Sequence, residues 1–128
     1  MFYRKNKFGA KKTKKSFDGI GWDSELEKNY YYYILKPRET AEEITDIKVH
    51  NSIELVPGIN WKVDFSYIEN GELIYDEVKG FETADYRLKK KLWTLFGPAK
   101  LNIIKGSGLR FHTVQTVKKG RHKVVIDV

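Results

Sequence analysis

Hydrophobic and polar residues alternate along residues 61–69 and again along residues 72–79, on either side of Asn70-Gly71. A period of two is typical of a strand with one buried face. Asn-Gly between two such runs favours a two-residue type I′ turn, because both central residues of that turn need a positive φ angle. The sequence therefore predicts a β-hairpin from Trp61 to Gly80.

The turn also sets the register of this hairpin. Counting outward from it, Asp64 lies directly opposite Glu77. Because side chains alternate between the two faces of a strand, Asp64, Glu77 and Lys79 project from one face. The other face is expected to be buried and is apolar apart from Asp76: Val63, Phe65, Tyr67, Ile74 and Val78.

Two carboxylates in opposite positions of a hairpin have Cβ atoms roughly 5 Å apart. Like charges at that distance repel, which raises the pKa of one of them. A divalent cation between Asp64 and Glu77 would remove the conflict, and Lys79 would offset more of it. The alternative is a solvated face with acids placed by chance, and a bulge in either strand would change the register.

The pattern predicts one helix before the hairpin and one after it. The first begins at Asp23 or Ser24 and ends before Pro37, and the second runs from a cap at Thr83 to Gly97-Pro98. Their expected buried stripes are Leu26, Tyr30, Tyr33 and Ile34 in the first helix, and Leu88, Leu92, Leu95 and Phe96 in the second.

Further strands are expected at residues 47–56 and 100–105, the latter parallel to a neighbour through a crossover. Residues 109–117 and 123–128 are expected to form a terminal hairpin around Lys119-Gly120. The fold class is therefore α/β, with a mixed sheet of four or more strands. His50, in the middle of the strand at 47–56, is interpreted as a surface or hydrogen-bonded residue.

Composition narrows the class of protein. The length of 128 residues fits one domain. The absence of cysteine excludes disulfides and thiolate metal sites and suits a reducing cytoplasm, and the dispersed histidines do not suggest zinc. No apolar stretch approaches the length of a membrane span or of a secretion signal, so neither membrane insertion nor secretion is expected.

The excess positive charge is concentrated at the start of the chain. Residues 1–16 contain seven Lys and Arg residues and no acid, whereas residues 17–128 contain 17 basic and 17 acidic residues. This predicts a flexible basic arm at 1–16 and one domain at 17–128. Such an arm favours a polyanionic partner such as nucleic acid, and a solubilising tail is the alternative.

Asp64 followed after a short hairpin by Glu77-Val78-Lys79 resembles the PD-(D/E)xK nuclease signature, with Val63 in place of the proline. The strings D-E-V-K-G-F-E-T-A-D-Y-R-L-K at 76–89 and F-D-G-I-G-W-D-S-E-L-E at 17–27 are similar to small phage-encoded nucleases of that superfamily. The resemblance covers roughly residues 8–105. It implies a restriction-endonuclease-like core, a mixed central sheet flanked by helices, with a C-terminal β-hairpin.

The resemblance also implies a catalytic site. Asp64, Glu77 and the Val78 carbonyl would hold Mg²⁺, for which Mn²⁺ would substitute, and Lys79 would orient the attacking water or stabilise charge. An acid on the first helix belongs to the site in such nucleases, and Glu27 matches it better than Glu25. Glu27 has two interpretations that stay open, either as part of a capping box with Ser24 or as a catalytic acid and ligand of a second ion.

The expected activity is hydrolysis of DNA phosphodiesters by a homodimer, on branched DNA such as a Holliday junction, in the cytoplasm of a phage host. The alternatives are a nicking, restriction-like or single-strand nuclease of the same fold, and a non-catalytic DNA-binding protein. Neither a membrane nor a small-molecule cofactor is expected. The residues expected to contact DNA are Lys5, Lys7, Lys11, Lys12, Lys14, Lys15, Tyr86 and Lys89.

Overall fold

A computed structural model of the chain describes residues 19–79 and 82–122. The predicted basic arm at 1–16 and the strand expected at 123–128 therefore lie outside the described residues. The elements are α1 (Glu25–Tyr30), η1 (Tyr31–Leu35), α2 (Lys36–Thr40), β1 (Thr45–Val56), β2 (Ile59–Glu69), β3 (Glu72–Val78), α3 (Ala84–Phe96), β4 (Lys100–Ser107) and β5 (Arg110–Val117).

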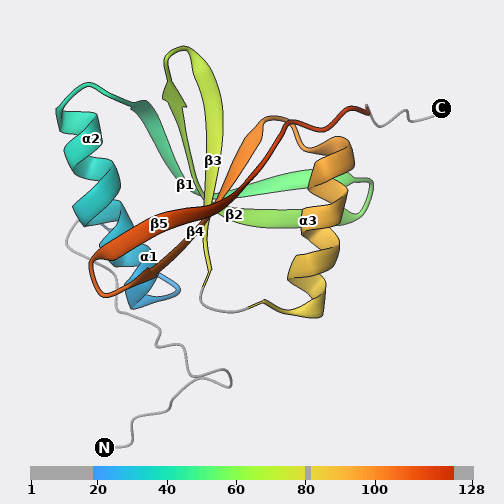
Figure 1. Cartoon of the computed structure of the whole chain (residues 1–128), viewed down its shortest axis with the longest axis horizontal. Coiled ribbons are helices and arrows are strands. Elements are labelled where there is room, and N and C mark those ends of the chain that lie inside the picture. Colours follow the sequence, from blue (N-terminus) through green and yellow to red (C-terminus); the bar gives the residue numbers. More distant parts are fainter. Residues whose placement is uncertain (1–18, 80–81, 123–128) are drawn as a thin grey trace, which may run out of the picture.

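The strands form one twisted sheet in the order β1-β2-β3-β4-β5, with the α1–α2 helical run and α3 on opposite sides of it (Figure 1). Strands β3 and β4 pair in parallel, and the other neighbours pair antiparallel. The predicted crossover between parallel strands is confirmed, and α3 provides it. This mixed α/β sheet flanked by helices is the architecture expected of a restriction-endonuclease-like core.

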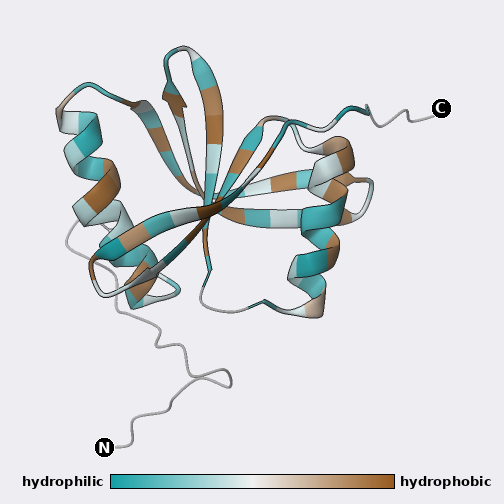
Figure 2. Ribbon diagram, in the orientation of Figure 1, coloured by the Kyte–Doolittle hydropathy of each residue, from teal (hydrophilic) through white to brown (hydrophobic). Residues whose placement is uncertain are grey.

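The hairpin of β2 and β3 has the predicted turn. Asn70 and Gly71 have φ angles of 52° and 77°, as a type I′ turn requires. The pairing runs from Glu69 opposite Glu72 to Phe65 opposite Asp76, which is the predicted register. Along the strands, hydrophilic and hydrophobic positions alternate (Figure 2). The local sequence of the turn is therefore sufficient to align the two strands.

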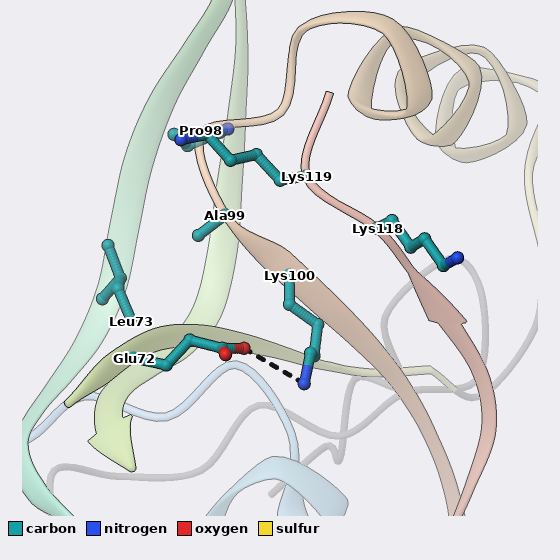
Figure 3. A pocket seen from close by; sticks show the side chains of 7 residues that line it. All are labelled: Glu72, Leu73, Pro98, Ala99, Lys100, Lys118 and Lys119. Atoms are coloured by element: carbon teal, nitrogen blue, oxygen red, sulfur yellow. Dashed lines mark ion pairs between the residues drawn. The ribbon is translucent and has the colours of Figure 1, made fainter. Parts of the chain in front are cut away.

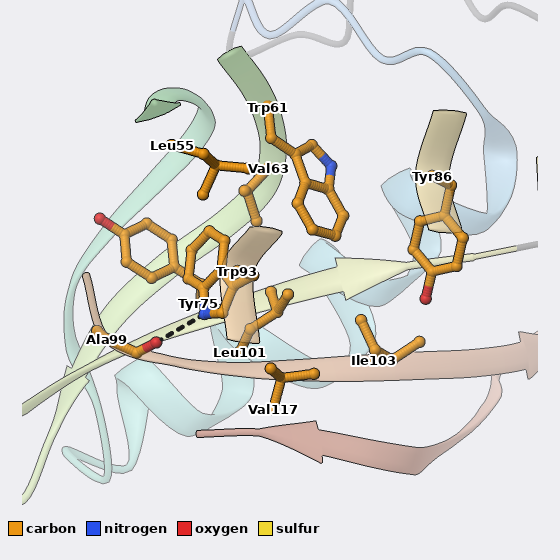
Figure 4. Close-up of a cluster of buried hydrophobic side chains, with 10 residues drawn as sticks. All are labelled: Leu55, Trp61, Val63, Tyr75, Tyr86, Trp93, Ala99, Leu101, Ile103 and Val117. Carbon is orange, nitrogen blue, oxygen red and sulfur yellow. Dashed lines mark hydrogen bonds between the residues drawn. The ribbon is translucent and has the colours of Figure 1, made fainter. Parts of the chain in front are cut away.

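The core is divided between the two sides of the sheet. One cluster packs β-strand residues such as Phe65 and Ile74 against Tyr30, Tyr31 and Leu35 of the first helical run. The other packs a different set of strand residues against α3, with Trp93 at its centre and its indole N–H donating to the Ala99 carbonyl (Figure 4): Leu55, Trp61, Val63, Tyr75, Leu101, Ile103 and Val117.

The expectation that Val63 shares a buried face with Phe65 and Tyr67 is wrong. Val63 belongs to the α3 cluster, whereas Phe65 and Tyr67 belong to the cluster under the first helical run. The reason lies in the pairing of β2. It pairs with β1 from Ile59 to Ile68, but its described pairing with β3 covers only Phe65 to Glu69, so its first half stays with β1 alone. The side of the sheet on which the apolar residues of β2 are buried therefore changes at Asp64, between Val63 and Phe65.

The first helix begins as predicted, because the Ser24 side chain accepts a hydrogen bond from the Glu27 backbone N–H. It does not end before Pro37. The turns at 31–35 are π-helical, and the Lys36 N–H bonds to the carbonyl of Tyr31, five residues earlier. The helix continues to Thr40, with Pro37 in the first turn of α2, where a proline is tolerated.

The π-helical turns also change which residues of this helix are buried. A π-helical turn holds more residues than an α-helical one and rotates the side chains that follow it. Tyr30, Tyr31 and Leu35 are therefore buried, whereas the expected core residue Tyr33 is 57% exposed. Of the predicted stripe, Tyr30 is buried and Ile34 packs against the core, whereas Leu26 is half-buried outside both core clusters and Tyr33 is exposed.

Helix α3 has the predicted limits, with Thr83 as its N-cap and Gly97 after its last residue. Its predicted apolar stripe is only partly confirmed: Leu92 packs against the core cluster, but Leu88 is 53% and Leu95 is 42% exposed. Tyr86 and Trp93, seven residues apart and therefore on one face, are buried instead. Their rings lie 5.7 Å and 5.8 Å from the ring of Trp61, so aromatic packing decides the orientation of the helix.

The C-terminal hairpin is formed by β4 and β5, which are joined at Gly108. The strand predicted at 109–117 is confirmed as β5, whereas the partner expected at 123–128 lies outside the described residues. Between them, the chain at Gly120 and His122 returns to the end of α3. The Gly120 N–H donates to the Gly97 carbonyl and the His122 N–H to the Leu95 carbonyl. These bonds satisfy carbonyl groups at the end of a helix, which otherwise lack intrahelical partners.

Candidate active site

The two predicted metal-binding acids lie where β2 and β3 cease to pair. Asp64 and Glu77 follow the last described pair, Phe65 and Asp76. The Asp64 backbone N–H donates to Glu77 Oε1 at 3.0 Å, and the Val78 N–H donates to Asp64 Oδ2 at 2.8 Å. The side-chain carboxylates thus take the place of ladder hydrogen bonds, and this exchange holds the two acids beside each other.

Lys79 is fixed beside this pair. Its Nζ lies 3.0 Å from Glu77 Oε2 and 4.7 Å from the centroid of the Tyr86 ring. Its backbone N–H donates to the Ile104 carbonyl of the neighbouring strand at 2.9 Å. The ammonium group is therefore held by a carboxylate and an aromatic ring together, on the face predicted from the hairpin register.

Glu27 combines the two interpretations that the sequence left open. Its backbone N–H completes the Ser24 cap. Its side chain does not reach back to the cap but is buried, with the residue 4% exposed, and Oε1 contacts Nε2 of His50 on β1. The carboxylate therefore faces the sheet and the hairpin acids.

These residues line one surface depression of about 390 Å³. It lies among the start of α1, the end of β3 and the first turns of α3, which point toward the same end of the molecule (Figure 1). Every predicted site residue within the described part of the chain lines it: Glu27, Asp64, Glu77, Val78, Lys79, Tyr86 and Lys89.

Crowding of the acids perturbs their protonation. Burial raises the pKa of Asp64 well above its usual value, and the negative charges of Glu77 and Glu27 raise it further. The hydrogen bond from Val78 and the charge of Lys79 act in the opposite direction but do not outweigh these effects. Burial is also the main cause of the raised pKa of Glu27. A cation in the depression would stabilise the charged forms of both groups and lower their pKa values.

A family model described as "Protein of unknown function (DUF1064)" matches residues 5–110. The chain belongs to the DUF1064 family. The matched range contains every residue that lines the depression, so the site lies within the family domain. Neither a curated protein nor a solved structure matches the chain.

In this DUF1064 member, Tyr86 does not occupy the surface position expected of a phosphate contact. It is 4% exposed, and its hydroxyl is shielded from solvent with no hydrogen-bond partner among residues 19–79 and 82–122. Burial raises the pKa of this hydroxyl to about 12. The prediction of direct DNA contact is therefore corrected: the ring is placed to hold Lys79, because the aromatic core of α3 draws it inward. Lys89, half-buried, pairs with Asp85 at 3.1 Å.

Two further candidate ligands were missed in the sequence: Asp23, which lines the depression, and His50, which contacts Glu27 from β1. Asp23, Glu27 and His50 each offer a ligand atom, and these atoms lie within 4.8 Å of one another. Asp23 stands four residues before Glu27, a helical spacing that could have suggested the pair. His50 has no such signal, because the folding of β1 beside α1 brings it to Glu27 from 23 positions away.

A larger hollow of about 580 Å³ lies elsewhere, between the β2–β3 turn and the chain after α3 (Figure 3). Its acid, Glu72, is already paired with Lys100 at 3.1 Å. Its other lining residues are apolar or are surface lysines. Its lining offers no group of three metal-ligating side chains, so the smaller depression is the candidate site among the described residues.

Among the described residues, no helix is long and apolar enough to cross a membrane.

Proposed function

We propose that the chain is a Mg²⁺-dependent endodeoxyribonuclease of the PD-(D/E)xK type. The observation that carries the proposal is the meeting of Glu27, Asp64, Glu77 and Lys79 in one depression. There the Asp64 N–H donates to the Glu77 carboxylate, and the Asp64 carboxylate accepts from the Val78 N–H. Two adjacent acids beside a fixed lysine are suited to phosphodiester hydrolysis, which needs a bound cation, an activated water and a group that stabilises developing negative charge.

The donor groups fit Mg²⁺, which prefers oxygen ligands. Asp64 and Glu77 would hold the ion, with the Val78 carbonyl as a further ligand. The hydrogen bonds that these carboxylates already accept are compatible with this role, because each carboxylate oxygen has two lone pairs. When bound, the ion would supply positive charge to the scissile phosphate and lower the pKa of a bound water.

The remaining groups have distinct tasks in this proposal. Lys79, held by Glu77 and the Tyr86 ring, orients the attacking water or stabilises charge on the phosphate. Glu27 is the third acid of this set and contributes to cation binding from the helix side. Lys89 lies at the depression, where release of its ion pair with Asp85 would free an ammonium group for a phosphate.

For the substrate we propose branched DNA, as in a Holliday-junction resolvase acting as a homodimer in the cytoplasm of a phage host. The small domain and the basic arm suit a substrate recognised by shape and charge. Resolution requires two symmetric cuts, hence two copies of the site. This part rests on the resemblance of the motif, whereas the nuclease chemistry rests on the site.

The test is digestion of a synthetic four-way junction, a linear duplex and a single strand, with Mg²⁺, with Mn²⁺ and with EDTA. Paired symmetric cuts on the junction are expected from the wild type with either ion. Lys79→Ala is expected to lose about 10²–10⁴-fold in rate, while Lys105→Ala, at an exposed position on β4, keeps it. Metal-dependent cleavage of the other DNAs would favour a nuclease of different specificity. No metal-dependent cleavage of any substrate would refute the enzyme.

A further inference from the structure

We propose that Asp23, Glu27 and His50 form a second cation site that prefers a transition-metal ion such as Mn²⁺ over Mg²⁺. One ligand atom from each residue lies within 4.8 Å of the other two, and the contact between His50 Nε2 and Glu27 Oε1 is direct. The role of this second site in DNA cleavage rests on the proposed function, whereas the binding of an ion to it is independent of that function.

The charges around the depression leave Glu27, the buried carboxylate of this site, without a lysine partner among the described residues. Five carboxylates and three ammonium groups line the depression. Each lysine already has a carboxylate partner: Lys62 pairs with Asp23 at 3.1 Å, Lys79 with Glu77 at 3.0 Å and Lys89 with Asp85 at 3.1 Å.

Glu27 and Asp64 are therefore the two carboxylates of the depression with no lysine or arginine in an ion pair, within the part of the chain that the structure describes. One ion at Asp64 and Glu77 would compensate the first pair of acids. Glu27 remains, together with the imidazole of His50 and the carboxylate of Asp23. Asp23 can keep its pair with Lys62 and still bind an ion, because a carboxylate has two oxygens.

The imidazole is positioned in advance. The buried Trp22 ring meets the His50 ring edge to face, with centroids 5.9 Å apart, and Glu27 contacts its Nε2. His50 has a φ angle of +57° in the middle of β1, a strained conformation for a non-glycine residue that persists only where its surroundings impose it. A ligand held in this way loses little freedom when an ion binds.

The kind of ion follows from the donor atoms. An imidazole nitrogen suits transition-metal ions such as zinc, iron and nickel, whereas carboxylate and carbonyl oxygens suit Mg²⁺ and Mn²⁺. Mn²⁺ is itself a first-row transition-metal ion and accepts a nitrogen ligand more readily than Mg²⁺, which keeps to oxygen. The pair of Asp64 and Glu77 offers only oxygens, while the second site offers one nitrogen and two carboxylates. The two sites should therefore differ in which ion they prefer. An excess of Mg²⁺ should displace Mn²⁺ from the first site more effectively than from the second.

The experiment is electron spin-echo spectroscopy of Mn²⁺ bound to the full chain, without DNA and with excess Mg²⁺. A directly bound imidazole gives a ¹⁴N modulation of the Mn²⁺ signal. We expect this modulation in the wild type and in His112→Gln, a matched change of an exposed histidine on β5, and its loss in His50→Gln. Asp23→Asn, at an exposed position, is expected to weaken Mn²⁺ binding by at least about tenfold.

Circular dichroism of each variant controls for folding, and Asp23→Asn tests the site without a buried change. Absence of the ¹⁴N modulation in the folded wild type overturns the proposal, as does a modulation that survives in His50→Gln. Because no DNA is present, these outcomes are independent of nuclease activity. A protein inactive on every DNA can still show the nitrogen ligand, and an active nuclease can lack it.

Discussion

The Tyr30 hydroxyl donates a 2.5 Å hydrogen bond to Oδ2 of Asp76, which joins the helix that carries Glu27 to the strand that carries Glu77. Asp76 is fully buried, and it also accepts from Tyr67 Oη at 3.0 Å and from Asn102 Nδ2 at 3.1 Å. Burial raises the pKa of Asp76, and the hydrogen bonds to its carboxylate partly counteract that effect. Asp76, the one polar residue predicted on the apolar face, is thus held by hydrogen bonds that link α1 to β3 beside the site.

Replacement of Tyr30 by Phe should destabilise the protein, because a buried carboxylate then loses one of its donors. Hydrogen bonds to charged groups contribute about 1.5–3 kcal/mol, so we expect the free energy of unfolding to fall by about that amount. Urea denaturation measures it. Tyr33→Phe on the same helix is the control, since that side chain is exposed, and its effect should stay within about 0.5 kcal/mol. Equal effects of the two changes would show that the Asp76 bond contributes nothing.

The raised pKa of Asp64 predicts how stability depends on pH. Burial, with the charges of Glu77 and Glu27, places this pKa above that of the unfolded chain. Between the two values the folded protein keeps a proton that the unfolded chain releases. The free energy of unfolding without metal should therefore fall as pH rises from about 4 through the folded pKa. Denaturation at a series of pH values in EDTA measures this, and Mg²⁺ should reverse the loss.

Asp64→Asn should remove that penalty. Without metal near pH 8, we expect a gain of about 0.5–2 kcal/mol, the usual scale of stabilising changes. The amide oxygen of the substituted side chain can still accept from Val78. Because the carboxylate ligand is gone, Mg²⁺ should no longer raise Tm. Glu54→Gln, on an exposed position of β1, is the matched control and should behave as wild type. A variant less stable than wild type in EDTA, with folding intact, would contradict the argument.

The sequence was a good guide wherever a local signal decides the structure. Asn70-Gly71 determines a turn through the φ angles of two residues, and the turn determines the register that brings Asp64 beside Glu77. Thr83 and Ser24 determine helix starts through single side-chain hydrogen bonds. The predicted acids and the lysine therefore share one face of the hairpin, as expected.

Features that depend on long-range packing were not predictable in this way. The π-helical turns at 31–35 have no local signal among four tyrosines, and they decide that Tyr33 is exposed. Leu88 and Leu95 of α3 are exposed because Tyr86 and Trp93 occupy the buried face, through contacts with Trp61 that are made only in the folded protein. The same holds for His50, which meets Glu27 only when β1 lies beside α1.

Two substitutions of Tyr86 separate its ring from its hydroxyl. The ring lies beneath the Lys79 ammonium at 4.7 Å, whereas the hydroxyl has no partner among the described residues. Tyr86→Phe should therefore keep the cleavage rate within about twofold and should not lower stability, since it removes an unsatisfied buried group. Tyr86→Leu removes the aromatic ring that contacts the Lys79 ammonium, and it should reduce kcat with little change in KM. A large loss of DNA affinity in Tyr86→Phe would instead identify the hydroxyl as a phosphate contact.

Removal of residues 1–16 should change how DNA binding depends on salt. These residues contain seven Lys and Arg residues and no acid, so the truncated chain has no excess charge. Each phosphate neutralised by a cationic residue contributes about 0.9 to the slope of log K against log salt concentration. If the whole arm binds, the slope should decrease in magnitude by up to about six on deletion. Fluorescence anisotropy with a labelled duplex at several salt concentrations measures it.

The same truncation distinguishes binding from catalysis. The residues that line the candidate site begin at Asp23, beyond the deleted segment, so cleavage of saturating DNA should keep its rate while KM rises. A charge-neutral arm with the seven basic residues changed to Gln is the control for chain length, and it should behave as the deletion does. Removal of Lys and Arg side chains that bind phosphates must alter counterion release, and therefore the salt slope. An unchanged slope would mean that the arm does not contact phosphates and serves to keep the protein in solution.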